Sequence, residues 1–485
     1  MMTGIVFTNR STGPISALFT LLALLGQWLQ RSFYLAGLAG LAGFGLFALP
    51  APLAAKEHFP LYPSIRANVA FWEDIYSRYT TRQAVLHDSV DLNRVYTVVE
   101  LVDRKAPMAS RINDLRISQA KDKMAALFDA LALGTAPRTR EERRIAQFFA
   151  GQPKSAYRRA KDTLRVQIGQ KDRFYEGVIR SGRYMPYIRS VLAAEQLPLE
   201  LAYLPHVESS FHPRAGSKAG AYGLWQFTRG TGQQYMTINS LVDERFDPYV
   251  STRAAVQFLK ENYAVLGTWP LAMTAYNYGR AGMVRAVRAH GTYEEIFRDY
   301  SQGYFKFASR NFYSEFLAAV RVAKRLESSG LVMDSPDKTH TYRLQEEVAF
   351  NRLRAKHQLE HAEFIRLNPA LQKPVLAGER KVPKNYLVRV PVINNLQQQA
   401  KKAHPSAKLR SPQLVTTPKT RLPATSRQEK RPGYFHYTVT QGDTLSAIAQ
   451  RFGVSKETIL VANNKGPHNP VRVGDRLVLP GKRQQ

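Results

Sequence analysis

Glu208 is the residue in this chain best placed to do acid–base chemistry. It lies in the stretch Leu204–Phe211, at the end of a helical-looking segment, and a glycine-punctuated loop follows. From Ser209 to Val242 there is no other Asp or Glu. That run does carry four large aromatic residues: Phe211, Tyr222, Trp225 and Phe227. A carboxyl group among aromatic side chains stays protonated near neutral pH and can donate a proton to a leaving oxygen. Aromatic faces also suit sugar rings, whereas the structural alternative is an ordinary surface helix residue.

The spacing around Glu208 resembles the core motifs of the soluble-lytic-transglycosylase family. A Glu-Ser-x-Phe block starts at Glu208, an Ala-x-Ser block at Ala215 and a Gly-Ala-x-Gly-Leu-x-Gln block at Gly220. Downstream, Tyr276–Gly279 resembles the family's Tyr-Asn-x-Gly block, and Asn311–Tyr313 resembles the block that supplies a substrate-side tyrosine. Because these blocks occur in order along one region, the resemblance is far more specific than a single short motif.

This resemblance implies a peptidoglycan lytic transglycosylase in which Glu208 is the only catalytic carboxyl group. Glu208 would protonate the β-1,4 glycosidic oxygen between N-acetylmuramic acid and N-acetylglucosamine. Its carboxylate would then take the proton of the muramic acid C6 hydroxyl, which closes a 1,6-anhydro ring without consuming water. The orientation of this tethered hydroxyl replaces the second carboxylate that most glycosidases need. The resemblance also implies five substrate-binding residues: Ser217, Gln226, Tyr276, Asn277 and Tyr313.

The next acidic residues along the chain are Asp243, Glu244 and Asp247. We expect this cluster to start a helix and to pair with Arg245 or Arg253 rather than to supply a second catalytic acid. Two other functions remain open, a hydrolytic muramidase on the same fold and a non-catalytic peptidoglycan-binding scaffold. The intact motif spacing argues against the scaffold, whereas only the reaction products separate the lyase from the hydrolase.

Composition limits the cofactors and partners of the chain. Its 485 residues allow roughly two to four domains. The absence of cysteine excludes disulfides, thiol nucleophiles and cysteine-based zinc sites, and no His-Glu-x-x-His arrangement exists, so neither a metal nor another cofactor is expected. The formal net charge of +31 implies an anionic partner. Because no nucleic-acid-binding motif is present, we expect peptidoglycan glycan strands and no nucleic acid.

Residues 1–55 read as a signal peptide or an N-terminal membrane anchor. Two apolar runs, Ile15–Leu29 and Phe33–Ala55, flank Arg31, and the second ends in small residues suited to signal cleavage. An uncleaved anchor is the main alternative, since about 20 apolar residues can span a bilayer. Either interpretation predicts export to the periplasm or cell envelope, with membrane association if the segment is retained.

Two segments with different patterns follow. Residues 56–170 have helical apolar spacing, and Thr139 and Glu142 have the spacing of a capping box, so this region is predicted to be a helical platform. Residues 171–330 are predicted to form the catalytic domain. Because strand signals there are scarce, we expect a mostly α, lysozyme-like fold.

The C-terminal part contains an internal repeat. Residues 338–392 align with residues 432–482, with Tyr342–Phe350 opposite Tyr437–Leu445. Each copy has the pattern strand, two helices, strand, which predicts small α+β (βααβ) modules after the catalytic domain. Between the copies, residues 393–431 are rich in Lys, Arg, Pro, Ser and Thr, which predicts a basic disordered linker.

The second copy resembles the LysM module. The resemblance implies glycan binding by the residues of its turn and of the loop after its second helix: Gly442, Asp443, Thr444, Leu445, Asn463 and Asn464. The alternative for Asp443 and Thr444 is helix capping alone. The first copy has Glu347-Val348-Ala349 in place of Gly-Asp-Thr, so it lacks both the glycine and the cap. We therefore expect it to be a degenerate LysM-like module whose sugar groove is doubtful.

Overall fold

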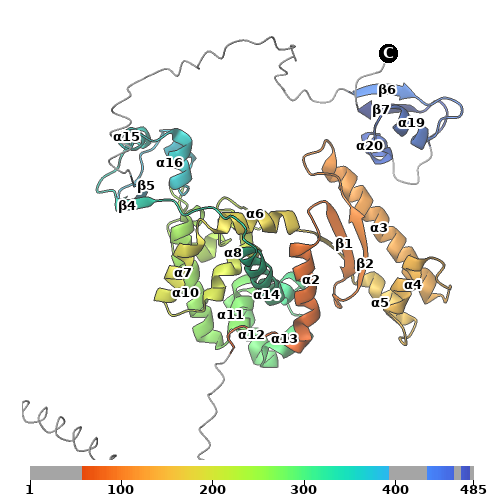
Figure 1. Cartoon of the computed structure of the whole chain (residues 1–485), viewed down its shortest axis with the longest axis horizontal. Helices are drawn as coiled ribbons and strands as arrows, with labels where there is room; N and C mark the ends of the chain where they lie inside the picture. The colour runs from red at the N-terminus through yellow and green to blue at the C-terminus, as the bar shows by residue number, and fades with distance from the viewer. Residues whose placement is uncertain (1–56, 393–433, 464–470, 481–485) are drawn as a thin grey trace, which may run out of the picture. The chain divides into compact units, whose positions relative to one another are not determined.

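The structure, a computed structural model, describes residues 57–392, 434–463 and 471–480 (Figure 1). The predicted signal peptide or anchor over residues 1–55 and the predicted linker over residues 393–431 lie outside these ranges. Within the described ranges, no helix combines the length and the apolar character needed to span a bilayer.

The segment predicted to be helical, residues 56–170, also contains a three-stranded antiparallel sheet. β1 (Gln83–Asp88) is central and pairs with β2 (Val95–Glu100) on one side and with β3 (Leu164–Ile168) on the other. These strands were not predicted. In β1 five of the six residues are buried, His87 and Asp88 among them, so its sequence shows no alternation of apolar and polar residues.

Helices surround this sheet in the described part of the N-terminal region. Thr139 accepts a hydrogen bond from the Glu142 amide, and the Glu142 carboxylate accepts one from the Thr139 amide, which confirms the predicted capping box. The helical elements are η1 (Pro63–Ile65), α2 (Arg66–Ser77), α3 (Ala109–Ala132), α4 (Arg140–Gln147) and α5 (Ser155–Asp162).

Residues 171–328 are built from helices, and this described range contains no strand. The longest helix, α14, is buried along most of its length, with Phe312, Phe316 and Ala323 in the core. The elements are α6 (Lys171–Ser181), α7 (Met185–Ala194), η2 (Leu199–Tyr203), α8 (Leu204–Ser209), α9 (Arg229–Gly232), η3 (Glu244–Phe246), α10 (Pro248–Leu266), α11 (Trp269–Tyr278), α12 (Arg280–His290), α13 (Tyr293–Asp299) and α14 (Phe307–Ser328).

The core of this helical region also includes α2, which comes from the N-terminal segment (Figure 1). The buried amide of Asn68 on α2 donates to the side-chain oxygen of Asn311 on α14 over 2.8 Å. Phe59 packs against Phe316, with ring centroids 5.2 Å apart. A buried polar pair inside an apolar contact fixes the register of two helices, because a shift breaks the hydrogen bond between the two side chains in a place without water. α2 is therefore part of the core of the helical region.

Two small α+β modules follow, each with the predicted order of strand, helices, strand. In the first, the strands pair antiparallel with Thr339 opposite Pro391, and in the second with Tyr434 opposite Pro480. The elements of the first are β4 (Thr339–Arg343), α15 (Phe350–Lys356), α16 (His361–Leu367), α17 (Lys373–Leu376) and β5 (Leu387–Pro391). Those of the second are β6 (Tyr434–Thr438), α19 (Leu445–Arg451), α20 (Lys456–Ala462) and β7 (Arg476–Pro480).

One asparagine has the same role in both modules. The Asn368 side chain accepts from the Arg389 amide and donates to the Arg389 carbonyl, each over 2.9 Å. The Asn463 side chain makes the same two bonds with the backbone of Val478, over 2.7 and 2.9 Å. In each module this side chain satisfies a backbone N–H and a backbone C=O of the last strand, as a neighbouring strand would, and it connects the end of the second helix to that strand.

The first module is joined to the helical region by backbone hydrogen bonds. The Asp243 amide donates to the Ala370 carbonyl over 2.8 Å, and the Gln372 amide donates to the Leu241 carbonyl over 3.0 Å. Together these bonds form a short antiparallel bridge between the segment before η3 and the segment before α17. The module is thus attached to the same segment that supports the loop following Glu208.

Candidate active site

Glu208 lies in the last turn of α8, where the chain reverses sharply. The two residues after the helix, Ser210 and Phe211, both adopt left-handed backbone angles, with φ of 48° and 57°. The Ser209 hydroxyl donates to the Leu224 carbonyl over 2.7 Å, which ties the end of α8 to the loop that follows. Residues other than glycine rarely adopt left-handed φ angles, and they do so where surrounding contacts hold the backbone in place.

The surroundings of Glu208 keep its carboxyl group protonated. The side chain is partly buried, and desolvation raises its pKa to about 8. Below that pH the proton is present, so at neutral pH Glu208 can act as a general acid. This is the protonation state predicted from its isolation among aromatic residues.

The loop from Ala215 to Phe227 is held by its own side chains. The Gln226 amide donates to the Gly223 carbonyl over 2.9 Å and to the Ala215 carbonyl over 3.3 Å. Gly223 has φ of 82°, and a Cβ there would lie 1.8 Å from a carbonyl oxygen, so only glycine fits.

A buried ion pair supports this loop from beneath. Arg245 binds Asp243 through Nε and Nη2, over 2.9 and 2.6 Å, and both side chains are almost fully buried. The remaining Nη1 of Arg245 donates to the Gly220 and Phe227 carbonyls, over 3.1 and 3.3 Å. Of the two arginine partners expected for Asp243, the structure uses Arg245. This arginine joins the two ends of the glycine-rich segment.

The other acids of this cluster also have structural partners. Asp247 caps α10 by accepting the amides of Tyr249 and Val250, as predicted for a helix start. Glu244 accepts the Thr237 amide over 2.7 Å. These contacts give the cluster a positioning role and leave Glu208 as the acid of the loop.

Three side chains from other helices interact electrostatically with the Glu208 carboxyl group. Tyr76 on α2 and Tyr276 on α11 both have pKa values raised above their usual range, by desolvation first. The charge of Glu208 is the second cause for Tyr276, whereas for Tyr76 the charge of Glu315 comes second and that of Glu208 third. Glu315 on α14 is partly exposed, and desolvation together with the charge of Glu208 raises its pKa to about 8. Arg165 on β3 acts on Glu315 in the opposite direction, by a smaller amount. The site therefore contains a second neutral carboxyl group beside Glu208.

The five predicted substrate-binding residues differ from one another in burial and in hydrogen-bond partners. Ser217 is exposed, and its hydroxyl accepts the Ala221 amide over 3.1 Å. Asn277 is exposed, and its side-chain oxygen accepts a hydrogen bond from the Ser309 hydroxyl over 2.8 Å. Gln226 closes the loop as described above.

The two predicted tyrosines lie deeper. The half-buried Tyr276 donates to the Trp225 carbonyl over 2.8 Å, close to Glu208. Tyr313 is fully buried, and its hydroxyl donates to the Pro60 carbonyl over 3.0 Å. The pKa of Tyr276 is raised by desolvation first and by the charge of Glu208 second.

Sequence reasoning missed Tyr76 and Glu315. Tyr76 belongs to the segment interpreted as a separate platform, and no local motif connects it with Glu208. Glu315 was within reach, because it lies four residues after Asn311 and two after Tyr313, on the helix that carries the fourth motif block. Residues four apart share one face of a helix.

The LysM-like turn of the C-terminal module has the geometry expected of a cap. Gly442 has φ of 86°, and the Thr444 hydroxyl accepts the Ala447 amide at the start of α19, before Leu445. The Asp443 carboxylate accepts hydrogen bonds from the Tyr437 hydroxyl and from Thr440, which lower its pKa to about 2. Asn463 is committed to the backbone of β7, and Asn464 lies outside the described residues.

Two family models match this chain. Residues 187–296 match the Transglycosylase SLT domain, and residues 437–480 match the LysM domain. The first match contains Glu208 and the loop after it, and the second contains the Gly-Asp-Thr turn. These matches confirm both resemblances drawn from the motifs and the expected fold class, a mostly α, lysozyme-like domain followed by a small α+β module.

The chain is also similar to individual proteins. It is 24% identical over 310 residues to membrane-bound lytic murein transglycosylase D of Escherichia coli strains K12 and O6:H1, an alignment that covers 62% of this chain and 64% of each relative. It is 36% identical over 110 residues to a putative tributyltin chloride resistance protein of Alteromonas sp. strain M-1, covering 22% of this chain and 53% of that one. Among solved structures, an inactive mutant of the lytic transglycosylase Slt from Pseudomonas aeruginosa matches with a TM-score of 0.24 and 18% identity, over 31% of this chain and 25% of that chain.

Proposed function

Because the chain carries a Transglycosylase SLT domain and a LysM domain, we propose that it is a peptidoglycan lytic transglycosylase. The observation that carries this proposal is Glu208, a carboxyl group at the end of α8 whose burial raises its pKa to about 8. The substrate is the glycan strand, cleaved at the β-1,4 bond between N-acetylmuramic acid and N-acetylglucosamine.

The reaction uses Glu208 twice. First, its proton passes to the glycosidic oxygen, the bond from that oxygen to C1 of muramic acid breaks, and the N-acetylglucosamine end leaves as an alcohol. Second, the Glu208 carboxylate takes the proton of the C6 hydroxyl, whose oxygen bonds to C1. The carboxyl group is thereby restored, and the product is a 1,6-anhydro sugar. Because the attacking hydroxyl belongs to the substrate, positioning replaces a base that would activate water.

The neighbouring Glu315 makes a hydrolytic muramidase the second candidate, because most glycosidases use two carboxyl groups. Its pKa of about 8, however, keeps Glu315 neutral at pH 7, so it offers no negative charge for activating water or attacking C1. This supports ring closure over hydrolysis. A reducing-sugar assay on digested peptidoglycan tests the choice, since anhydro ends do not reduce the reagent.

We assign substrate-binding roles in this proposal by position. Ser217 is exposed near the start of the loop after Glu208, and Asn277 is exposed near the end of α11. Sugar groups can therefore reach both side chains. Gln226 and Tyr276 support the loop through backbone carbonyls, and they act by positioning. Tyr313 supports the fold from within the core.

The relatives named membrane-bound support a location in the cell envelope, which cell fractionation tests.

We propose that the C-terminal LysM module holds the enzyme on its insoluble substrate. The turn at Gly442–Leu445 is fixed by the Asp443 and Thr444 hydrogen bonds, which leaves a preformed edge for N-acetyl sugars. A preformed site loses little conformational entropy on binding. Tethering then raises the local concentration of glycan at the catalytic domain without any change in the chemistry.

Deletion of residues 432–485 is expected to reduce binding to insoluble peptidoglycan by about 10-fold or more, because tethering is lost. Turnover of short soluble glycans should stay within about 2-fold of the full-length rate, since the deleted module makes no contribution to Glu208. A pull-down with insoluble peptidoglycan measures the first quantity and a soluble-fragment assay the second. Collapse of soluble turnover in the deletion variant would show that the module is structural and contradict its targeting role.

A further inference from the structure

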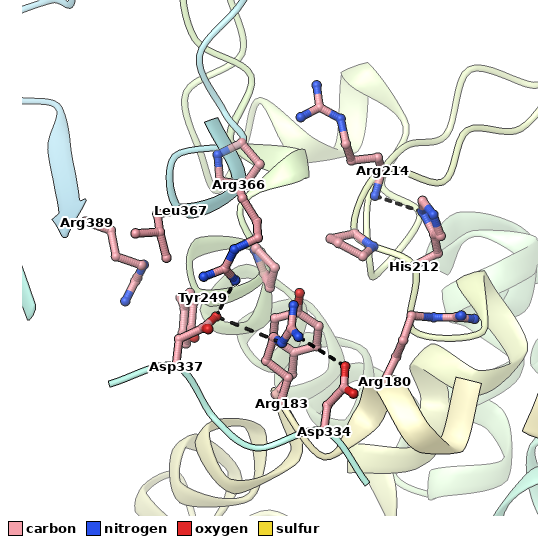
Figure 2. Close-up of a pocket in the computed structure, with 14 residues that line it drawn as sticks. Arg180, Arg183, His212, Arg214, Tyr249, Asp334, Asp337, Arg366, Leu367 and Arg389 are labelled. Atoms are coloured by element: carbon pink, nitrogen blue, oxygen red, sulfur yellow. Dashed lines mark hydrogen bonds and ion pairs between the residues drawn. The ribbon is translucent and has the colours of Figure 1, made fainter. Parts of the chain in front are cut away.

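A cavity of about 260 Å³ lies between the catalytic helices and the first βααβ module (Figure 2). Its walls come from the end of α6 and the turn after it, from the loop after Glu208 and from the start of α10. Residues 334–337 and, in the module, the end of α16 and β5 complete them. Tyr184, Tyr249 and Leu367 supply an apolar side. The volume exceeds that of a single water, about 30 Å³, several times over, so the cavity has room for a small organic group.

The charge of this cavity is strongly positive. Five arginines line it and only two carboxylates do: Arg180, Arg183, Arg214, Arg366 and Arg389 against Asp334 and Asp337. Figure 2 shows that the two carboxylates are already occupied. Arg183 binds Asp334 over 3.2 Å, and Arg366 binds Asp337 over 2.8 Å. Of the remaining arginines, Arg180 pairs with Glu176 over 3.6 Å, whereas Arg214 and Arg389 line the cavity without a carboxylate partner among the described residues.

Arg214 and Arg389 come from different walls of the cavity. Arg214 lies on the catalytic loop, and Arg389 lies on β5 of the module. The guanidinium of Arg389 stacks on the Tyr249 ring, 3.6 Å from its centroid, and its Nε is buried without a hydrogen-bond partner. A buried donor without a partner costs free energy that a bound acceptor would recover.

The position of Arg389 is fixed before any ligand arrives. Asn368 holds the Arg389 backbone through two hydrogen bonds of 2.9 Å, and Tyr249 lies against its guanidinium. Guanidinium groups bind carboxylates through paired, parallel hydrogen bonds. A preordered arginine opposite a second, exposed arginine is an arrangement that selects a carboxylate over a neutral group.

The cavity is continuous with the active-site loop. Arg180 donates to the Ser210 carbonyl over 2.9 Å, two residues after Glu208, and His212–Arg214 forms one rim. A polymer held at Glu208 can therefore place a side branch here. In peptidoglycan the side branch is the peptide stem carried by N-acetylmuramic acid, which bears free carboxylates and small methyl or methylene groups.

We propose that this arginine cavity, formed by the catalytic domain together with the first module, binds a free carboxylate of the peptide stem. The proposal rests on the proposed function and adds the part of the substrate that the first module recognises. It gives that module a role in peptide recognition, although it lacks the Gly-Asp-Thr turn of the second copy.

The test measures binding alone, with residues 57–485 and no turnover. Calorimetry with an acetylated stem tripeptide should give saturable binding, whereas the same peptide with its carboxylates converted to amides should not bind. Arg389→Gln and Arg214→Gln should each weaken binding by about 10-fold, since charge-assisted hydrogen bonds are lost. Arg111→Gln, an exposed arginine on α3, should leave the affinity unchanged and serves as the matched control.

Each contrary outcome has a distinct meaning. Equal binding of the amidated peptide, or unchanged affinity in both cavity variants, would overturn the proposal. Tighter binding of inorganic phosphate than of the peptide would replace it with a phosphate-bearing ligand. Arg214 is exposed, so its variant remains informative if Arg389→Gln lowers the melting temperature. A chain that binds the peptide but does not cleave glycan would contradict the proposed function and leave this inference intact.

Discussion

Glu208→Gln is expected to reduce the release of soluble fragments from peptidoglycan by at least about 10²–10⁴-fold. Glutamine keeps the size and polarity of the side chain, but it can neither donate a proton as an acid nor accept one as a base. Because one residue serves both steps, its loss removes acid and base catalysis together. Turbidity clearing measures the rate, and a melting curve checks that the fold is retained.

The same carboxyl group predicts the pH dependence of the wild-type rate. The acid form of Glu208 is the reactive one, and its pKa is about 8, so the rate should fall as the pH rises above that value. Stability changes in the same direction. The native pKa is raised above that of an unfolded glutamate, so the folded state loses stability as the pH rises through about 8. Glu208→Gln should remove that loss.

Glu315→Gln is the matched control, because it removes the neighbouring carboxyl group and keeps Glu208. We expect its rate to remain within about 10-fold of wild type, since Glu315 contributes to the electrostatics of the site and transfers no proton. Near-normal activity of Glu208→Gln would contradict the account and point to Glu315 as the acid. Equal inactivity of both variants would mean that the two carboxyl groups act as a unit.

Arg245→Met is expected to destabilise the catalytic domain by about 3–5 kcal/mol, because it leaves Asp243 buried without its cation. The substitution also removes the donors to the Gly220 and Phe227 carbonyls, which hold both ends of the loop after Glu208. Activity should therefore fall at temperatures where the variant is still folded. Urea denaturation followed by circular dichroism measures the free energy of unfolding.

Arg253→Met is the control for that measurement. Arg253 is an exposed arginine whose guanidinium bonds the Tyr187 hydroxyl over 2.7 Å, so its loss should cost less than about 1 kcal/mol. The double variant Asp243→Ala/Arg245→Met should be less destabilised than the sum of the single changes, since neither charge is then left unpaired. A cost below 1 kcal/mol for Arg245→Met would refute the supporting role of this ion pair.

The proposal that Glu208 is the catalytic carboxyl group starts from a local signal in the sequence. Glu208, its loop and the aromatic residues around it are contiguous in sequence, and the glycines mark the turns that the backbone needs. Helix starts at Thr139 and Asp247 could be predicted for the same reason, because a cap depends on residues two or three positions apart. The strand–helix–helix–strand modules followed from their internal repeat.

The rest of the site depends on packing between distant segments. Tyr76 reaches Glu208 only because α2 packs against α14, a contact fixed by the buried Asn68–Asn311 pair. Glu315 comes from α14, which is far from the Glu208 loop in the sequence. The sheet formed by β1, β2 and β3 was missed because a fully buried strand has no alternating pattern. Such contacts carry no short-range signal in the sequence.

The central claim is that Glu208 closes an anhydro ring and does not activate water. Purified residues 57–485 should be incubated with peptidoglycan, and the released fragments weighed by mass spectrometry, with Glu208→Gln as the blank. The account predicts ends about 18 mass units lighter than hydrolysed ones, because intramolecular attack adds no water. Predominantly reducing, hydrated ends that disappear in the blank would contradict it and identify a muramidase that uses Glu208 with a second carboxyl group.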